Sequence, residues 1–131
     1  GHFIISAGSA PSGSSCGVSV QAGTSMAAPI VAGNAALIRQ YFEQGFYPTG
    51  VRVKANSFTP MGALVKAVMI NSARGVNGMY GQRNMDRDSR PSSAQGWGRT
   101  ILDDVLFPAE KGNKRTTFVD GDFNDMPTIY S

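Results

Sequence analysis

The chain has 131 residues, of which 41% are hydrophobic and 16% charged, a balance typical of a globular domain rather than a disordered segment. Its net charge of +3 arises from scattered basic residues, and Arg83, Arg87 and Arg90 are interleaved with Asp86 and Asp88. Nucleic acid is therefore not expected as a partner, because its binding requires a basic patch of one sign with interleaved aromatic residues.

The charges are unevenly placed along the chain. Residues 1–38 contain no Asp, Glu, Lys or Arg, so Arg39 is the first formal charge after the N-terminus. We expect residues 1–38 to be mostly packed against other protein, and a chain of 131 residues offers little material to cover them. The longest apolar run, residues 26–38, is too short and too rich in Ala and Gly to span a membrane.

Two short strands are predicted before the first helix. Residues 2–7 form an apolar run, and residues 8–17 are dense in Gly, Ser and Pro, which predicts a loop. Residues 18–22 alternate between apolar and polar side chains, which predicts a second strand ending at Gly23. Cys16, the single cysteine, has no partner within the chain for a disulfide.

A long helix is predicted from Ser25 to Phe42. Its side chains are apolar on nearly every face, which is typical of a buried helix. Pro29 is tolerated without distortion only in the first turn, where its missing N–H has no intrahelical partner. The helix is therefore expected to begin at or just after Ser25, which places this serine at the helix N-terminus.

A second helix is predicted to follow Thr59 as N-cap and Pro60 as its first residue. Apolar residues at i, i+3, i+4, i+7 and i+8 form one stripe: Met61, Leu64, Val65, Val68 and Met69. We expect this helix to end near Ala73, with Gly75 as its stop signal.

The rest of the chain is predicted to be mostly irregular. Residues 74–95 are polar and charged, and residues 101–107 form a short amphipathic piece closed by Pro108. Residues 109–115 are typical of a linker, and residues 116–119 begin a further strand.

Ser25 is the strongest candidate for chemistry. Unpaired N–H groups and the positive end of the dipole at a helix N-terminus would stabilise an oxyanion formed there. The alternative from spacing alone, and the more common one, is that Ser25 simply caps the helix. The Gly-x-Ser-x-Gly elbow of lipases is not matched, because Ala27 stands at the second glycine and no histidine follows Ser25.

Residues 23–33, Gly-Thr-Ser-Met-Ala-Ala-Pro-Ile-Val-Ala-Gly, resemble the nucleophile motif of the subtilisin-like peptidases, the subtilases. Other segments follow in the family's order. Residues 1–6 resemble the strand before the nucleophile loop, residues 63–73 a helix rich in Leu, Lys and Ala, and residues 95–102 the closing Gly-Trp-Gly segment. The resemblance covers most of residues 1–108.

The resemblance implies an α/β fold, with a parallel sheet and helices on both of its faces. In this interpretation residues 1–108 are the C-terminal part of a catalytic domain, and residues 109–131 a linker and first strand of a β-sandwich domain. It also implies peptide-bond hydrolysis by an Asp, His, Ser triad with Ser25 as nucleophile. Gly23, Thr24 and Met26 are then expected near the oxyanion hole or the substrate cleft.

The triad's Asp and His, and the oxyanion-hole asparagine, are expected upstream of Gly1. His2 is the single histidine, and the resemblance places it in a strand where the family has no catalytic histidine, so we interpret it as structural. The chain alone is therefore expected to be inactive, since a serine without a general base is a weak nucleophile. Because residues 1–38 lack their cover, we also expect it to be poorly soluble or molten.

No cofactor is required by the expected mechanism, and calcium is compatible with the family analogy. Residues 120–125 begin like a calcium loop, but the EF-hand's later ligand positions do not match, which favours a solvated turn. The expected partners are a polypeptide substrate and the upstream part of the catalytic domain, and the family analogy implies a secreted or lumenal location. The alternative function is an inactive structural or interaction fragment of a subtilase-like protein.

Overall fold

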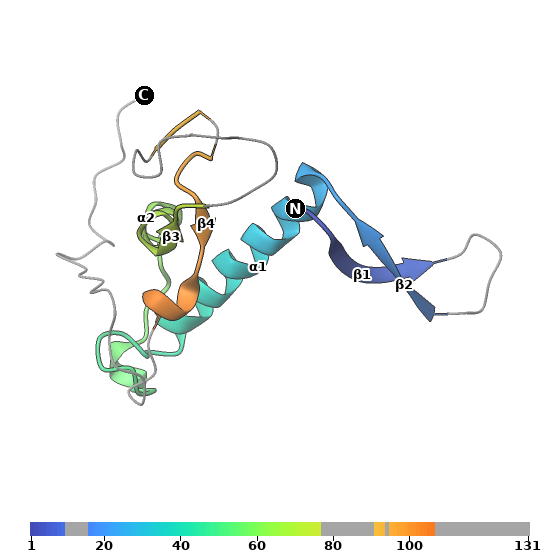
Figure 1. The fold of residues 1–131 in the computed structure, drawn as a ribbon. Helices are drawn as coiled ribbons and strands as arrows, with labels where there is room; N and C mark the ends of the chain where they lie inside the picture. Colours follow the sequence, from blue (N-terminus) through green and yellow to red (C-terminus); the bar gives the residue numbers. More distant parts are fainter. Residues whose placement is uncertain (10–15, 77–90, 94, 107–131) are drawn as a thin grey trace, which may run out of the picture. The chain divides into compact units, whose positions relative to one another are not determined.

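The computed structural model describes residues 1–9, 16–76, 91–93 and 95–106. It divides the chain into two compact units, Gly1–Gly33 and Asn34–Ser131 (Figure 1). The fold is a small mixed α/β structure in which both described sheets are two-stranded and antiparallel. The parallel sheet stays a prediction. So do the β-sandwich and the division at residue 108, because residues 107–131 lie outside the described part of the chain.

The first unit is built on a β-hairpin. Strand β1 (Ile4–Ser9) pairs with β2 (Cys16–Gln21), so that Ile5 lies opposite Val20 and Ala7 opposite Val18. Both predicted strands are confirmed, but the loop predicted over residues 8–17 is shorter than expected. Residues 8, 9, 16 and 17 belong to the hairpin, because the pairing of backbone groups continues through small residues that carry no strand pattern.

The long helix α1 (Thr24–Glu43) confirms the helix predicted from Ser25. The argument from Pro29 is wrong in detail, because this residue is the sixth of the helix and lies beyond the first turn. The expected all-round burial is also not seen: Ile30 is 46% exposed, Val31 42% and Leu37 53%. The described residues provide cover for α1 mainly near its C-terminal end, where its buried residues are Ile38, Tyr41 and Phe42.

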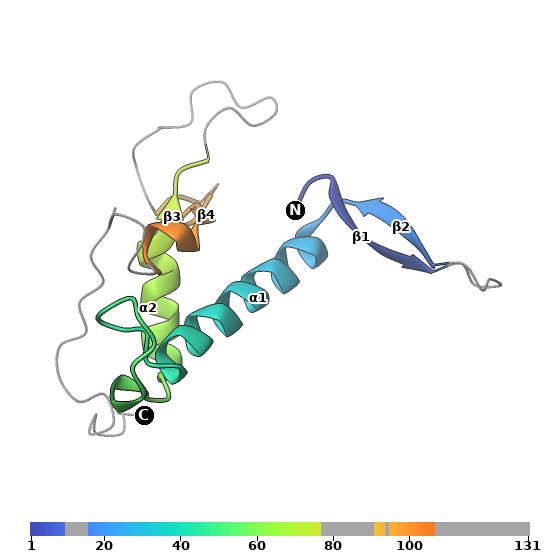
Figure 2. The same cartoon turned by 90° about the horizontal axis from the view of Figure 1, so that it is seen from below.

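The hydrophobic core lies in the second unit, where the end of α1 packs beside α2 (Gly62–Ser72) (Figure 2). The buried core residues are Ile38, Tyr41, Phe42, Leu64, Val68 and Val105. Aromatic rings extend this core: the Phe42 ring centroid is 5.1 Å from that of Phe58 and 5.6 Å from that of Tyr47. Such tilted pairs add directional attraction to the burial of apolar area.

Helix α2 is confirmed, and so is its predicted end near Ala73, but its predicted start at Thr59-Pro60 is wrong. Its N-cap is Met61, which makes no side-chain capping hydrogen bond, so the helix starts later than the Thr59-Pro60 signal. At the other end the helix stops near Ala73 because residues 73–74 pair as a strand, and not because of Gly75. The predicted stripe is buried at Leu64 and Val68, whereas Met61 is 39% exposed.

Two strands that the sequence patterns did not predict close the second unit. Strand β3 (Ala73–Arg74) pairs antiparallel with β4 (Arg99–Thr100). Asp104, in the short 3₁₀ helix of residues 102–104, accepts a hydrogen bond from Arg74 Nε at 2.7 Å and is only 8% exposed. Asn34 Nδ2 donates to Thr100 Oγ1 at 2.6 Å. These polar contacts join α1, β3 and the segment after β4.

Gly98, just before β4, has a φ of 103°, which side chains of L residues rarely adopt. A Cβ atom placed on it would lie 2.1 Å from the carbonyl oxygen of Arg74. The second glycine of the Gly-Trp-Gly segment is therefore needed for the close approach of β4 to β3.

Candidate active site

Ser25 is the second residue of α1 and its side chain is exposed to solvent. β2 ends at Gln21, so only three residues separate the hairpin from this serine. The first N–H groups of a helix have no intrahelical acceptor, and the positive end of the helix dipole lies here. An anionic oxygen formed beside Ser25 would therefore be stabilised by its surroundings.

Gly23 sets the geometry of the turn into α1. Its φ of 147° lies in the range that favours glycine. Its N–H donates to the carbonyl of Gly1 at 2.8 Å, and its own carbonyl accepts from the amino group of Gly1 at 2.8 Å and from the N–H of Met26 at 3.2 Å. These bonds hold the residues on both sides of Ser25 in place.

The hydroxyl of Ser25 makes no hydrogen bond to another described residue. A capping serine would accept a hydrogen bond from an N–H two or three positions later. The simple capping role that spacing alone favoured is therefore not seen in the described part of the chain. The hydroxyl is free to take part in another contact.

Pro29 lies one turn after Ser25 in α1. An ordinary residue at this position would donate its N–H to the carbonyl of Ser25, and proline has no N–H to donate. The proline thus weakens the helical hydrogen bonding at the residue that carries the candidate nucleophile, and leaves that carbonyl available to other donors.

The other predicted site residues lie around the same turn. Thr24 is exposed, and Met26 is half-buried. The sulfur of Met26 lies beside Gly23, 3.8 Å from the position that a Cβ on this glycine would take. The structure therefore brings Gly23, Thr24 and Met26 together with Ser25, as their spacing in the sequence requires.

His2 is exposed, and its ring lies against that of Phe3 with a centroid distance of 4.2 Å. The structural role expected of His2 stays a prediction.

No group of three or more His, Cys, Asp or Glu side chains suited to a metal ion occurs among residues 1–9, 16–76, 91–93 and 95–106. The loop at residues 120–125, considered for calcium, lies outside these ranges. Within the same part of the chain, no helix has the length and apolar character needed to cross a membrane.

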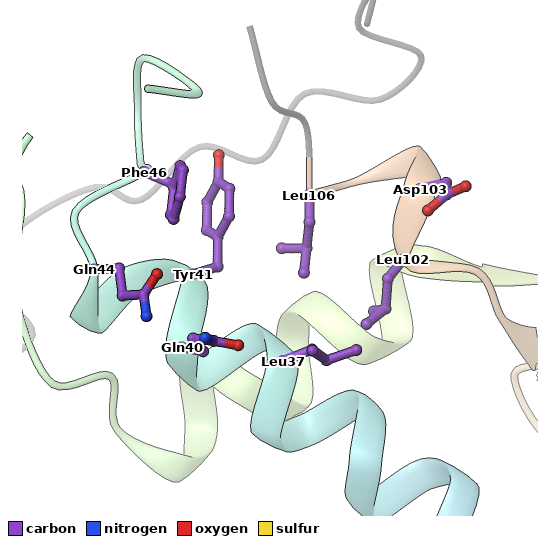
Figure 3. Close-up of a pocket in the computed structure, with 8 residues that line it drawn as sticks. All are labelled: Leu37, Gln40, Tyr41, Gln44, Phe46, Leu102, Asp103 and Leu106. Carbon is purple, nitrogen blue, oxygen red and sulfur yellow. The ribbon is translucent and has the colours of Figure 1, made fainter. Parts of the chain in front are cut away.

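An open cavity of about 400 Å³ lies in the second unit, and none of the predicted site residues lines it (Figure 3). Its walls are Leu37, Gln40, Tyr41, Gln44, Phe46, Leu102, Asp103 and Leu106. The Tyr41 hydroxyl is buried without a hydrogen-bond partner among the described residues. Burial, with a smaller effect from the nearby Tyr47, raises the pKa of Tyr41 above its ordinary 10.0.

Sequence reasoning did not single out Asn34, Arg74 or Asp104, whose polar contacts support the helix that carries Ser25 and its neighbouring strands. A signal existed for Asn34, because it is the one polar side chain in residues 26–38 and a buried polar group needs a partner. No comparable signal marks Arg74 or Asp104 among the other charged residues.

An exposed serine at the N-terminus of a helix, preceded by a glycine-dependent turn, defines Ser25 as a candidate nucleophile of the serine hydrolase class. Comparison with known proteins assigns the family. The sequence model of the subtilase family, peptidase S8, matches residues 7–98, and the chain therefore belongs to this family. The membership inferred from residues 23–33 is confirmed.

Three curated relatives come from Dictyostelium discoideum and carry the name serine protease/ABC transporter B family protein. The protein tagD is 35% identical over 105 residues, covering 72% of this chain and 6% of the relative. The protein tagB is 36% identical over 96 residues, covering 65% of this chain and 5% of the relative. The protein tagA is 31% identical over 98 residues, covering 75% of this chain and 5% of the relative.

The chain thus corresponds to about one-twentieth of the length of these relatives. No solved structure matches it significantly.

Proposed function

We propose that this chain is the serine-bearing part of a serine endopeptidase that hydrolyses peptide bonds through an Asp-His-Ser triad. The observation that carries the proposal is the exposed Ser25 at the start of α1, in a chain that belongs to the subtilase family. The Asp and the His are supplied by polypeptide outside this chain. This chain corresponds to only 5–6% of the length of the relatives, so the rest of a protein of that length is long enough to contain the Asp and the His.

In this mechanism Oγ of Ser25 forms a bond to the carbonyl carbon of the scissile peptide, and its proton passes to the histidine. The carbonyl oxygen becomes an oxyanion, which the backbone N–H of Ser25 and the dipole of α1 stabilise. The C–N bond then breaks as the histidine returns the proton to the leaving amine. Water hydrolyses the acyl-enzyme by the same steps and restores Ser25.

The surrounding residues have supporting roles in the proposal. Gly23 and Thr24 position the nucleophile, and Met26 contributes to the wall of the substrate cleft. The complete catalytic domain holds a parallel sheet with helices on both faces, and residues 109–131 lead into a β-sandwich domain. The reaction requires no cofactor, calcium is compatible with it as a structural ion, and the protein acts on polypeptides in a secreted or lumenal compartment.

A second candidate function is an inactive structural or interaction fragment of a subtilase-like protein. The exposed apolar side chains of Ile30, Val31 and Leu37 favour it, because surfaces of this kind associate with other protein. The two functions differ in one requirement: only the peptidase needs a histidine within hydrogen-bonding reach of the Ser25 hydroxyl.

The test is to replace Ser25 by Ala in the full-length protein and to measure peptide hydrolysis, labelling by a fluorophosphonate probe and thermal unfolding. The control is Ser6→Ala, at another exposed serine of the first unit. We expect Ser25→Ala to abolish hydrolysis and labelling, whereas Ser6→Ala retains both. Full activity of Ser25→Ala, or a wild-type protein that neither hydrolyses peptides nor reacts with the probe, would contradict the proposal.

A further inference from the structure

The cavity of the second unit has mainly apolar walls. They include Leu37 on α1 and Leu102 and Leu106 after β4, and the ring of Phe46 stacks on that of Tyr41 with a centroid distance of 5.8 Å (Figure 3). Leu37 is 53% exposed, and Leu102 and Leu106 are half-buried. An apolar hollow of about 400 Å³ that is open to water favours the entry of an apolar side chain.

The described part of the chain stops at this cavity. Leu106, one of its walls, is the last described residue, so the chain continues into residues 107–131 from the cavity wall. Phe118, in the strand predicted over residues 116–119, follows Leu106 by 12 positions. A loop of that length closes at a modest cost in entropy, and the Pro and Gly residues between the two positions favour turns. The chain is thus long enough to bring Phe118 back to the cavity.

Charge favours Phe118 over Phe123, an aromatic residue that follows it in the chain. Asp103 lines the cavity, is exposed and forms no ion pair with another described residue. Residues 111–115, just before Phe118, carry three basic side chains and no acidic one. Phe123 lies within residues 120–125, whose three Asp side chains the carboxylate of Asp103 would repel. The segment around Phe118 therefore complements the cavity in both polarity and charge.

We propose that this cavity is the docking site for residues 116–119 of the same chain, with Phe118 in its interior and the basic residues 111–115 beside Asp103. A cavity of about 150 Å³ holds a benzene ring, so about 400 Å³ accommodates the Phe118 ring and part of its strand. The predicted first strand of the next domain is thereby fixed against the C-terminal part of α1. This docking goes beyond the proposed function and does not depend on the triad.

The test measures solvent access to the cavity in the full-length protein. Leu37→Cys reports on the cavity, and Val51→Cys is its matched control, because Val51 is 54% exposed and does not line the cavity. Each is made in a Cys16→Ser background, and alkylation of the new cysteine by iodoacetamide is followed by peptide mass spectrometry. We expect Phe118→Ser to raise the labelling rate of Leu37→Cys about tenfold, since wild-type labelling requires transient opening, and to leave Val51→Cys unchanged.

Phe107→Ser makes the same replacement in the same segment and should change neither rate. An unchanged Leu37→Cys rate in Phe118→Ser, or an equal rise in Phe107→Ser, would overturn the proposal. Protection of Leu37→Cys that is lost on dilution would identify a second copy as the cover and would also overturn it. Reactivity of Ser25 with the fluorophosphonate probe is measured in the same samples, so that loss of the peptidase function and loss of the docking site are distinguished.

A charge exchange provides a second test if Phe118→Ser does not fold. Asp103→Lys places a cation beside the basic residues 111–115, so labelling of Leu37→Cys should become about threefold faster, the scale of an exposed ion pair. Replacing the three basic residues by Glu in the same protein should restore the slower rate. No change on Asp103→Lys, or no recovery on the reciprocal replacement, would refute the docking of this segment.

Discussion

Replacing Gly98 by Ala is expected to destabilise the protein far more than replacing its neighbour Gly96. Both glycines have a positive φ, 103° at Gly98 and 55° at Gly96, so each substitution incurs a conformational cost. A Cβ on Gly96 meets no atom within 4 Å, whereas one on Gly98 would lie 2.1 Å from the oxygen of Arg74, well inside the 3.0 Å that real Cβ atoms essentially never cross. Only the Gly98 variant must also move backbone.

The difference can be worked out from these contacts. The left-handed conformation costs a non-glycine residue about 1–2 kcal/mol, which is the whole expected effect of Gly96→Ala. Relieving an overpacked contact adds about 1–3 kcal/mol at Gly98, because β4 must move away from β3. Gly98→Ala should therefore lower the free energy of unfolding by about 2 kcal/mol more than Gly96→Ala does.

Denaturant unfolding of the full-length protein, followed by circular dichroism, measures both variants on one scale. Asparagine variants separate the two causes, because Asn tolerates the left-handed region better than Ala. Gly96→Asn should recover most of the loss, and Gly98→Asn should recover little. Equal destabilisation by Gly98→Ala and Gly96→Ala would refute the steric argument.

Three further predictions concern Tyr41, Asp104 and Ser25. Tyr41→Phe removes a buried hydroxyl that lacks a described partner and should leave stability unchanged or raise it by about 1 kcal/mol in thermal unfolding at pH 7. Burial raises the pKa of Tyr41, so its contribution to the free energy of unfolding is fully present below pH 10 and is lost as the pH rises towards the raised pKa. A pH series of thermal melts should show a smaller loss of stability in Tyr41→Phe than in the wild type. Asp104→Asn should cost about 2 kcal/mol, since it leaves the partly exposed Arg74 facing a neutral group, and a melt unchanged from the wild type would contradict this. Ser25→Ala should change the unfolding free energy by less than about 0.5 kcal/mol, because its exposed hydroxyl makes no described hydrogen bond, and a larger loss would restore the capping role.

Much of the local structure could be predicted from short stretches of sequence. Alternation of apolar and polar side chains located β2, and the apolar run after Gly23 located α1 to within one residue at each end. These predictions succeeded because strand and helix periodicity depend on neighbours two to four positions away. The same local information placed Ser25 at a helix N-terminus, and the motif of residues 23–33 led to the family that the comparison confirms.

Local patterns were weaker at the ends of elements. The Thr59-Pro60 signal is a good helix start by composition, yet α2 begins at Gly62. At its other end, residues 73–74 leave the helix because they pair with residues 99–100, which no stretch around Ala73 reveals. The predicted end near Ala73 is therefore right, but strand pairing rather than the glycine at position 75 accounts for it.

The sequence by itself determined the helix that carries Ser25, the turn glycine before it and the membership of the subtilase family. Only the tertiary structure decided the contacts between distant positions: Arg74 meets Asp104 across 30 residues and Asn34 meets Thr100 across 66. It also decided which apolar side chains are covered, leaving Val18 exposed and Ile38 fully buried. The physical reason is that periodicity shows a residue to be apolar, whereas burial depends on which segments of chain fold against it.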